Sequence, residues 1–241
     1  LSAREPLDIR GAIDWLFDRT DVNQTALGLV GHSLGGMSVI RAAAQDPRVN
    51  ACVELGAPLS IENLLNKYVS NMDFTLFQLY VNLWNDLSNP TVLEETAPIN
   101  VVNVTHPRNF LMCYGDLDYA ATLEEQKSYL INATGNASAE IGVLYGDYHY
   151  GNATELIRYE SVYHGDEPRH SEIIVDVINW MEMSLNGQNP TPLTTSGLLF
   201  WHHPLIPGDW MIFAGILFVL GGTIPIVINL FKKKKQKNDT A

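Results

Sequence analysis

The chain has 241 residues, of which 46% are hydrophobic and 17% are charged, and it contains two cysteines. This composition suits one sizeable domain with a tail, and it excludes a disordered chain, a repeat array and a disulfide-stapled miniprotein. The net charge is −12; five lysines and two aspartates lie beyond residue 208, which leaves 10 basic and 25 acidic residues before it. A surface so acidic repels phosphate backbones, which argues against nucleic acid as a partner.

The first part of the chain alternates between expected helices and strands. It begins with an amphipathic helical pattern, in which Ile9, Ile13, Leu16 and Phe17 share one face. We then expect strands over residues 26–32, 51–56, 110–114 and 156–162, and helices over residues 34–45, 123–131 and 171–185. Continuous apolar strands separated by helices predict an α/β fold, with a mostly parallel sheet that helices cover on both faces. The two cysteines, Cys52 and Cys113, fall within expected strands and are predicted to be buried thiols.

A Gly-X-Ser-X-Gly sequence lies between the first expected strand and the helix that follows it. Gly31-His32-Ser33-Leu34-Gly35 in this context is typical of a nucleophile elbow, which projects a serine hydroxyl from the carboxyl edge of a sheet. The glycines two residues before and after the serine are expected to avoid clashes. The Leu34 N–H, at the start of the helix, is the predicted oxyanion donor. Ser33 is therefore the candidate nucleophile.

With this motif in this position, residues 1–186 resemble the α/β-hydrolase family of serine hydrolases. The resemblance implies an acid after a later strand and a histidine after the last strand. Asp118 follows the third expected strand in a loop similar to the family's acid loop, and Asp116 is the alternative acid. His164 stands where the last expected strand ends, and we take it as the candidate base.

Other histidines compete with His164 for the role of the base. His170 lies beside the start of the last expected helix and is the first alternative, and His149, among tyrosines, is the second. His32 is interpreted as a packing residue beside the nucleophile.

The resemblance implies catalysis through an acyl-serine intermediate. His164 would remove the proton of Ser33, and Asp118 would orient the imidazole. No cofactor is expected, and the histidines and cysteines lack the sequence spacing of a metal site. We therefore predict a serine hydrolase of carboxylic esters or peptides; the alternative is a surface protein that uses a hydrolase scaffold for binding only.

Two regions of the chain bear on how complete this domain is. Residues 59–108 are rich in apolar side chains and lie where the family inserts lids, so they predict a lid or cap, with helices packed on the sheet as the alternative. The family has several strands before the elbow, and these are absent from this chain. We expect either that a longer protein supplies them or that the oxyanion hole has a single donor, and we expect the segment alone to be weakly active.

The C-terminal part of the chain has the pattern of a membrane anchor. Residues 187–208 form a Pro-rich linker, residues 209–231 a predicted transmembrane helix, and residues 232–241 a basic tail. A buried core helix is the alternative for the second segment. By the positive-inside rule the lysines are cytoplasmic, which puts the hydrolase domain outside the cytoplasm. Within residues 1–186, five Asn-X-Ser/Thr triplets agree with an external glycoprotein, and they begin at Asn23, Asn103, Asn132, Asn136 and Asn152.

Overall fold

The structure is a computed structural model, and it describes residues 5–60, 63–64, 67, 97–187 and 193–195. The chain divides into two compact units, Leu1–Thr194 and Thr195–Ala241. The predicted transmembrane helix and basic tail, most of the linker and most of the predicted lid lie outside the described residues. Among the described residues, no helix has the length and apolar character that crossing a bilayer requires.

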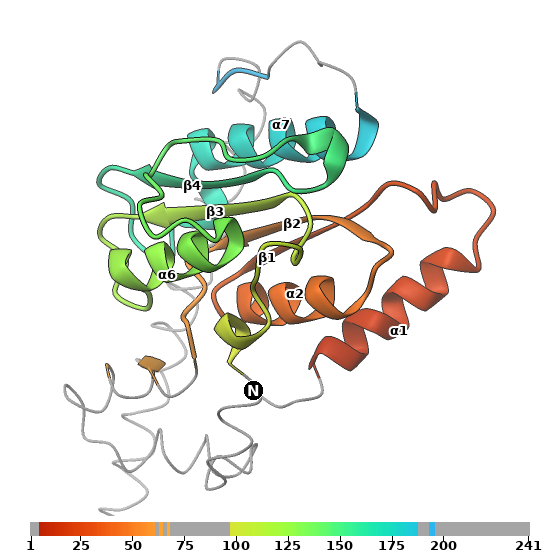
Figure 1. Cartoon of the computed structure of the whole chain (residues 1–241), viewed down its shortest axis with the longest axis horizontal. Coiled ribbons are helices and arrows are strands. Elements are labelled where there is room, and N and C mark those ends of the chain that lie inside the picture. The colour runs from red at the N-terminus through yellow and green to blue at the C-terminus, as the bar shows by residue number, and fades with distance from the viewer. Residues whose placement is uncertain (1–4, 61–62, 65–66, 68–96, 188–192, 196–241) are drawn as a thin grey trace, which may run out of the picture. The chain divides into compact units, whose positions relative to one another are not determined.

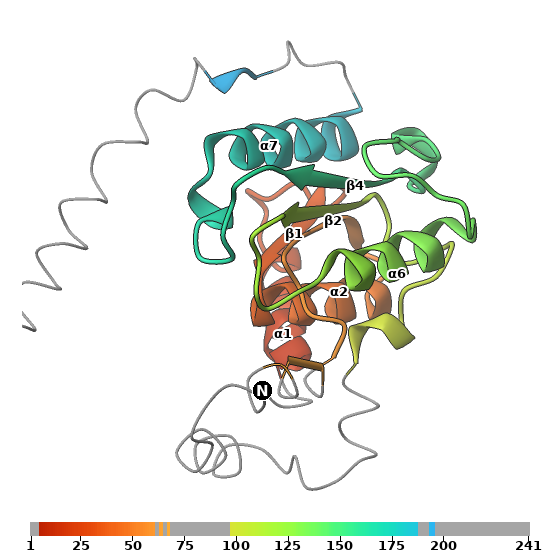
Figure 2. The same ribbon diagram turned by 90° about the vertical axis from the view of Figure 1, so that its left-hand side faces the viewer.

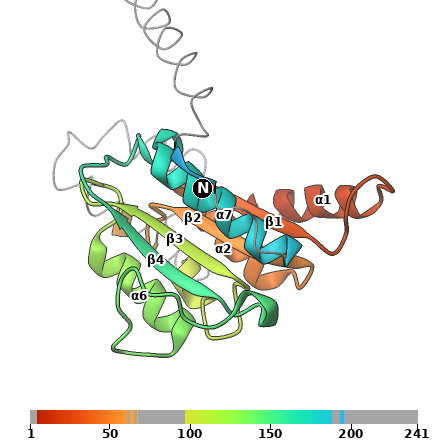
Figure 3. The same cartoon turned by 90° about the horizontal axis from the view of Figure 1, so that it is seen from above.

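The described fold is built on a sheet of four parallel strands. These are β1 (Leu27–His32), β2 (Val49–Leu55), β3 (Phe110–Gly115) and β4 (Thr154–Tyr159), paired in that order. All residues of β3 and nearly all of β2 are buried, as expected for central parallel strands with both faces covered. The predicted parallel α/β sheet is therefore confirmed, and Figure 3 shows the strands side by side beneath α7 (Ser171–Asn186).

Helices cover the two faces of the sheet unequally. Helices α2 (Leu34–Gln45) and α6 (Leu123–Thr134) pack on one face and α7 packs on the other, while α1 (Glu5–Phe17) packs on α2 (Figure 2). Successive side chains of a strand point to opposite faces. In β3, Met112 therefore packs on the α2 and α6 side and Cys113 on the α7 side, in two separate apolar cores.

The parallel arrangement brings the carboxyl ends of all four strands to one edge of the sheet (Figure 1). The segments that follow these ends carry the candidate residues. The last strand is shorter than predicted: β4 ends at Tyr159 rather than at residue 162, because Ser161 has a φ of 60°, which no strand residue adopts. His164 consequently lies on a loop five residues beyond the strand.

Candidate active site

Ser33 occupies a strained turn between β1 and α2. Its φ of 57° and ψ of −121° are rarely adopted by residues other than glycine, and its N–H donates to the carbonyl of Leu55 at 2.9 Å. At Gly31, an added Cβ would lie 2.3 Å from the carbonyl oxygen of Gly35. The turn therefore requires glycine at this position, as the elbow motif predicts.

The predicted requirement for glycine at position 35 is wrong. A Cβ at Gly35 would meet no described atom within 4 Å, whereas a Cβ at Gly36 would lie 2.8 Å from that of Ala57. The reason is that the following residue of α2, rather than Gly35, faces the loop after β2. Glycine is thus required at position 36, where the helix approaches Ala57 of that loop.

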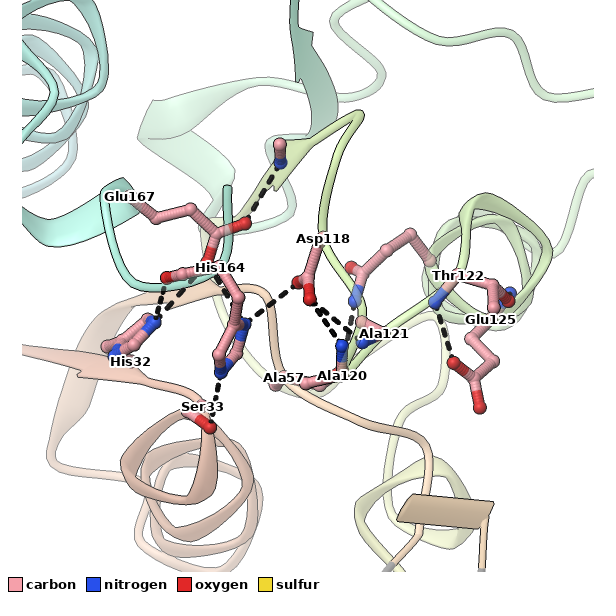
Figure 4. A network of polar contacts seen from close by, with 12 residues as sticks. His32, Ser33, Ala57, Asp118, Ala120, Ala121, Thr122, Glu125, His164 and Glu167 are labelled. Atoms are coloured by element: carbon pink, nitrogen blue, oxygen red, sulfur yellow. Dashed lines mark hydrogen bonds and ion pairs between the residues drawn. The ribbon is translucent and has the colours of Figure 1, made fainter. Parts of the chain in front are cut away.

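The structure brings Ser33, His164 and Asp118 together at the carboxyl edge (Figure 4). Nε2 of His164 lies 2.8 Å from Oγ of Ser33, and Nδ1 lies 3.0 Å from Oδ2 of Asp118. An ionised carboxylate can only accept, so Nδ1 carries the proton and Nε2 is left to accept from the serine hydroxyl. This tautomer is the one that general-base attack by the serine needs.

Backbone donors and burial hold the acid and the imidazole in place. Oδ1 of Asp118 accepts from the N–H groups of Ala120 and Ala121 at 2.6 Å and 3.2 Å. The Asp118 side chain has no exposed surface, and that of His164 is 8% exposed. The His164 ring also contacts the rings of His32 and Tyr119, with centroids 4.5 Å and 5.4 Å away. Few alternative rotamers are available to an imidazole with so many neighbours.

Asp116, the alternative acid, lies elsewhere in the same loop. Its carboxylate pairs with Arg158 at 3.1 Å and accepts from the N–H of Ser161 at 2.6 Å. The Arg158 guanidinium lowers the pKa of Asp116 below its usual range. Asp116 therefore ties its own loop to the turn that leads to His164, and it is Asp118 that contacts the imidazole.

The alternative histidines are not brought to Ser33. His170 is the N-cap residue of α7, and its ring lies 6.2 Å from that of Tyr159. His149 is exposed in the 3-10 helix η2 (Tyr148–Tyr150), which directly precedes β4 and so lies at the amino edge of the sheet. Of the three candidate bases, only His164 contacts the serine in the described part of the chain.

His32 lies beside Ser33 and also contacts the loop that carries His164. Its Nε2 lies 2.8 Å from the carbonyl oxygen of His164. A carbonyl can only accept, so Nε2 of His32 donates to it and holds the main chain of the histidine loop. Burial lowers the pKa of His32, but the Glu167 side chain and the accepting carbonyl outweigh burial and raise this pKa overall.

Two buried glutamates beside the site were not predicted from the sequence. Glu167 begins the 3-10 helix η3 (Glu167–Arg169), and burial raises its pKa. Glu54, in β2, is fully buried, accepts from the Ala57 N–H at 2.6 Å, and has its pKa raised well above its usual range by burial. Both glutamates fall in apolar or loop segments without a motif, so only their burial reveals them.

The described part of the predicted lid reaches the acid loop. Asn63 donates to the Glu125 carboxylate at 3.1 Å, and Lys67 forms an ion pair with the same carboxylate. Lys67 also donates to the carbonyl of Ala120 at 2.8 Å. Glu125 lies in the first turn of α6, where it caps the Thr122 N–H at 2.7 Å. Whether residues 59–108 cover the serine stays a prediction, because most of them lie outside the described residues.

A group of possible metal ligands appears in space that the sequence spacing did not reveal. Nitrogen atoms of His32 and His164 and a carboxylate oxygen of Glu167 lie within 4.8 Å of one another. However, Nε2 of His32 donates to a carbonyl and Nδ1 of His164 faces Asp118, so neither nitrogen offers a lone pair to a cation. Leu34 is the first residue of α2, and its predicted role as oxyanion donor stays a prediction.

Comparison with known proteins identifies the family of the chain. The chain matches the prolyl oligopeptidase family over residues 2–163, a range that contains Ser33 and Asp118 and ends just before His164. It is 27% identical to the putative hydrolase YtaP of Bacillus subtilis (strain 168) over 108 residues, which are 45% of this chain and 33% of YtaP.

Solved structures share the fold at low sequence identity. A puromycin-hydrolyzing peptidase of Mycobacterium tuberculosis superposes with a TM-score of 0.54 at 15% identity, covering 75% of this chain and 25% of that one. The esterase Pf2001 of Pyrococcus furiosus gives 0.53 at 15% identity, covering 76% of this chain and 62% of that one. The chain thus spans only part of the length of each of these relatives. Because the family match extends over well more than half of its residues, the chain belongs to the prolyl oligopeptidase family, a family of serine hydrolases with the α/β-hydrolase fold.

Proposed function

We propose that the chain hydrolyses carboxylic esters or peptides through an acyl-serine intermediate. The observation that carries this proposal is the continuous hydrogen-bonded line from Ser33 through His164 to Asp118. All three side chains follow the carboxyl ends of parallel strands, where the active sites of such sheets lie.

In the proposed acylation step, Oγ of Ser33 attacks the acyl carbon while Nε2 of His164 takes the hydroxyl proton. The imidazolium that forms is stabilised by Asp118, whose other oxygen is occupied by backbone N–H groups. The Leu34 N–H at the start of α2 would donate to the oxyanion, where the helix dipole favours negative charge. The imidazolium then returns the proton to the leaving alcohol or amine. Water, deprotonated by the same imidazole, releases the acyl group.

A fluorophosphonate probe tests the proposed nucleophile directly. We expect the probe to label Ser33 in the full-length protein, because the reagent reacts only with a serine that a base has activated. Ser33→Ala should abolish the labelling, whereas Ser38→Ala, which changes a serine within α2, should not. Intact-mass spectrometry and peptide mapping would measure both. A full-length protein that stays unlabelled would contradict catalysis and favour the binding protein.

We further propose that residues 209–231 anchor the hydrolase domain to a membrane, with residues 232–241 on the cytoplasmic side. The support is the sequence pattern: residues 210–231 contain no charged side chain and are followed at once by four lysines. We expect the protein to remain in the membrane pellet after washing with alkaline carbonate, and a variant that ends at residue 208 to be released. Release of the full-length protein by carbonate would refute the anchor.

The positions of the Asn-X-Ser/Thr triplets support a further part of this proposal, that the domain is a glycoprotein. The five such asparagines within residues 1–186 are all exposed: Asn23, Asn103, Asn132, Asn136 and Asn152. Each lies in a connection that leads into the amino end of a strand, or at the end of α6 on its way back to β4. The loop between α1 and β1, for instance, lies at the end of the sheet away from the β3 arrowhead (Figure 1). The edge that carries Ser33 has no such triplet among the described residues.

We expect glycans on this amino edge and none near the serine. Glycopeptide mass spectrometry of the protein from its natural host should detect sugar at these asparagines. Each Asn→Gln variant should lose the mass of one glycan while labelling of Ser33 is unchanged, because the sites lie across the sheet. Thr25→Ala should remove the glycan at Asn23 and leave the asparagine intact. A native protein without added mass would show that the domain is not a glycoprotein.

A further inference from the structure

Glu167 is a fully buried carboxylate three residues beyond His164, and the proposed mechanism leaves it without a role. Its side chain has no exposed surface. Oε1 accepts from the N–H of Gly115, the last residue of β3, at 2.9 Å. Burying a carboxylate carries a free-energy cost, so a side chain placed here calls for a physical reason.

The other oxygen of Glu167 faces the two histidines. Oε2 lies 3.4 Å from Nε2 of His32 and 3.7 Å from Nδ1 of His164. No described donor reaches Oε2 at the length of an ordinary hydrogen bond. Oε2 therefore lies near two nitrogens but accepts an ordinary hydrogen bond from neither of them. Figure 4 shows Glu167 beside the line from Ser33 to Asp118.

The carboxylates of Glu167 and Asp118 both lie beside Gly56. A Cβ on this glycine would lie 2.3 Å from Oε2 of Glu167 and 2.6 Å from Oδ2 of Asp118. The φ of Gly56 is +55°, which also favours glycine. The single N–H at Nδ1 of His164 therefore has two carboxylates within reach, one at hydrogen-bond distance and one 0.7 Å farther.

We propose that Glu167 is a positioning residue of the catalytic centre with two tasks. Together with His32, it holds the main chain of the histidine loop. Its Oε2 is also a second acceptor for Nδ1 of His164. It can orient the imidazole and stabilise the imidazolium when the carboxylate of Asp118 is missing. This inference rests on the proposed function, because both tasks serve general-base catalysis by His164.

The second task should depend on pH. Burial raises the pKa of Glu167, and a protonated carboxyl group cannot stabilise an imidazolium as a carboxylate does. The titratable groups around it are His32 on β1, Glu54 on β2, Asp118 after β3 and His164 on its own loop. The contribution of Glu167 should therefore be small at low pH and increase as the pH rises through its raised pKa.

Four proteins measured at several pH values test the proposal: the full-length protein and its Asp118→Asn, Glu167→Gln and doubly substituted variants. The readout is the rate at which a fluorophosphonate phosphonylates Ser33, with loss of fluoride, which needs no knowledge of the substrate. We expect rates lower by about 3-fold for Glu167→Gln, about 10²-fold for Asp118→Asn and about 10⁴-fold for the double variant. The double loss exceeds the product of the single losses, and this excess should increase with pH.

A matched control separates the charge of Glu167 from general effects on its loop. Asp166→Asn removes a carboxylate from the neighbouring, exposed residue, which lies 3.8 Å from Arg169, and should leave the rate unchanged in either background. Thermal melting verifies that each variant is folded. If glutamine at position 167 prevents folding, Glu167→Asp, which withdraws the carboxylate by one methylene, should still lower the rate of Asp118→Asn.

Each outcome gives a decision. If the single losses multiply to the double loss at every pH, or if Glu167→Asp leaves the rate of Asp118→Asn unchanged, Glu167 is not a second acceptor. The proposed function would survive that result, because Ser33 would still be labelled in the unmodified protein. If the unmodified protein is not labelled at all, the proposed function fails and this inference fails with it.

Discussion

Replacing His164 by alanine is expected to lower the rate at which a fluorophosphonate labels Ser33 by about 10⁴-fold. The physical reason is that a serine hydroxyl is a weak nucleophile at neutral pH, and in the proposed mechanism Nε2 of His164, 2.8 Å away, takes its proton. The pseudo-first-order rate of fluorophosphonate labelling measures this loss. Added imidazole should restore part of the rate, because it can enter the space that the ring has left and act as the base.

The two alternative histidines provide matched controls for this result. His170→Ala and His149→Ala each remove one imidazole, but neither ring contacts Ser33, so we expect rates within about threefold of the unmodified protein. A loss for His170→Ala as large as for His164→Ala would make His170 the base and would contradict the geometry described above.

Asp118→Asn is expected to lower the same rate by about 10²-fold. The asparagine keeps the shape of the side chain and can still accept from Ala120 and Ala121, but its amide no longer holds Nδ1 of His164 in the protonated tautomer by charge. The loss is smaller than the roughly 10⁴-fold typical of a triad acid because Glu167 remains as a carboxylate near Nδ1. Time courses of fluorophosphonate labelling at a range of pH values would measure this loss.

Asp116→Asn, two residues away, is the control for Asp118→Asn. It breaks the ion pair with Arg158 and weakens the turn at Ser161, so we expect a lower melting temperature. The rate of labelling per folded molecule should remain within about threefold of normal, because Asp116 does not contact the imidazole. If Asp116→Asn instead abolishes labelling while Asp118→Asn is harmless, the acid is Asp116.

The elbow could be predicted from the sequence because its geometry is local. Gly31, Ser33 and the start of α2 are contiguous, and the contact that requires glycine at position 31 is with the backbone of Gly35, four residues later. The choice between Gly35 and Gly36 could not be predicted in the same way. It depends on Ala57, which follows a different strand, and the helical phase that brings Gly36 to it is set by the packing of α2 on the sheet.

The parallel arrangement of the strands could also be predicted, because a parallel sheet requires helical connections and buries its central strands on both faces. The residues at which the strands end could not be predicted. The expected strand extends to Val162 because that residue is apolar. In the structure, however, Asp116 accepts a hydrogen bond from the N–H of Ser161, and the chain turns there. His164 therefore lies on a loop, and this geometry depends on the carboxylate of Asp116, which lies 45 residues before Ser161 in the chain.

By itself the sequence determined the elements, their parallel arrangement and the set of titratable residues from which the candidate site had to be assembled. These follow from hydrophobic periodicity and from a turn formed by neighbouring residues. Only the tertiary structure shows that Asp118 rather than Asp116 contacts His164, and that His164 rather than His170 contacts Ser33. Only it places Glu167 and His32 near the imidazole. These choices depend on which side chains meet at distances of about 3 Å after segments more than 40 residues apart have packed, and burial then decides which charges they carry.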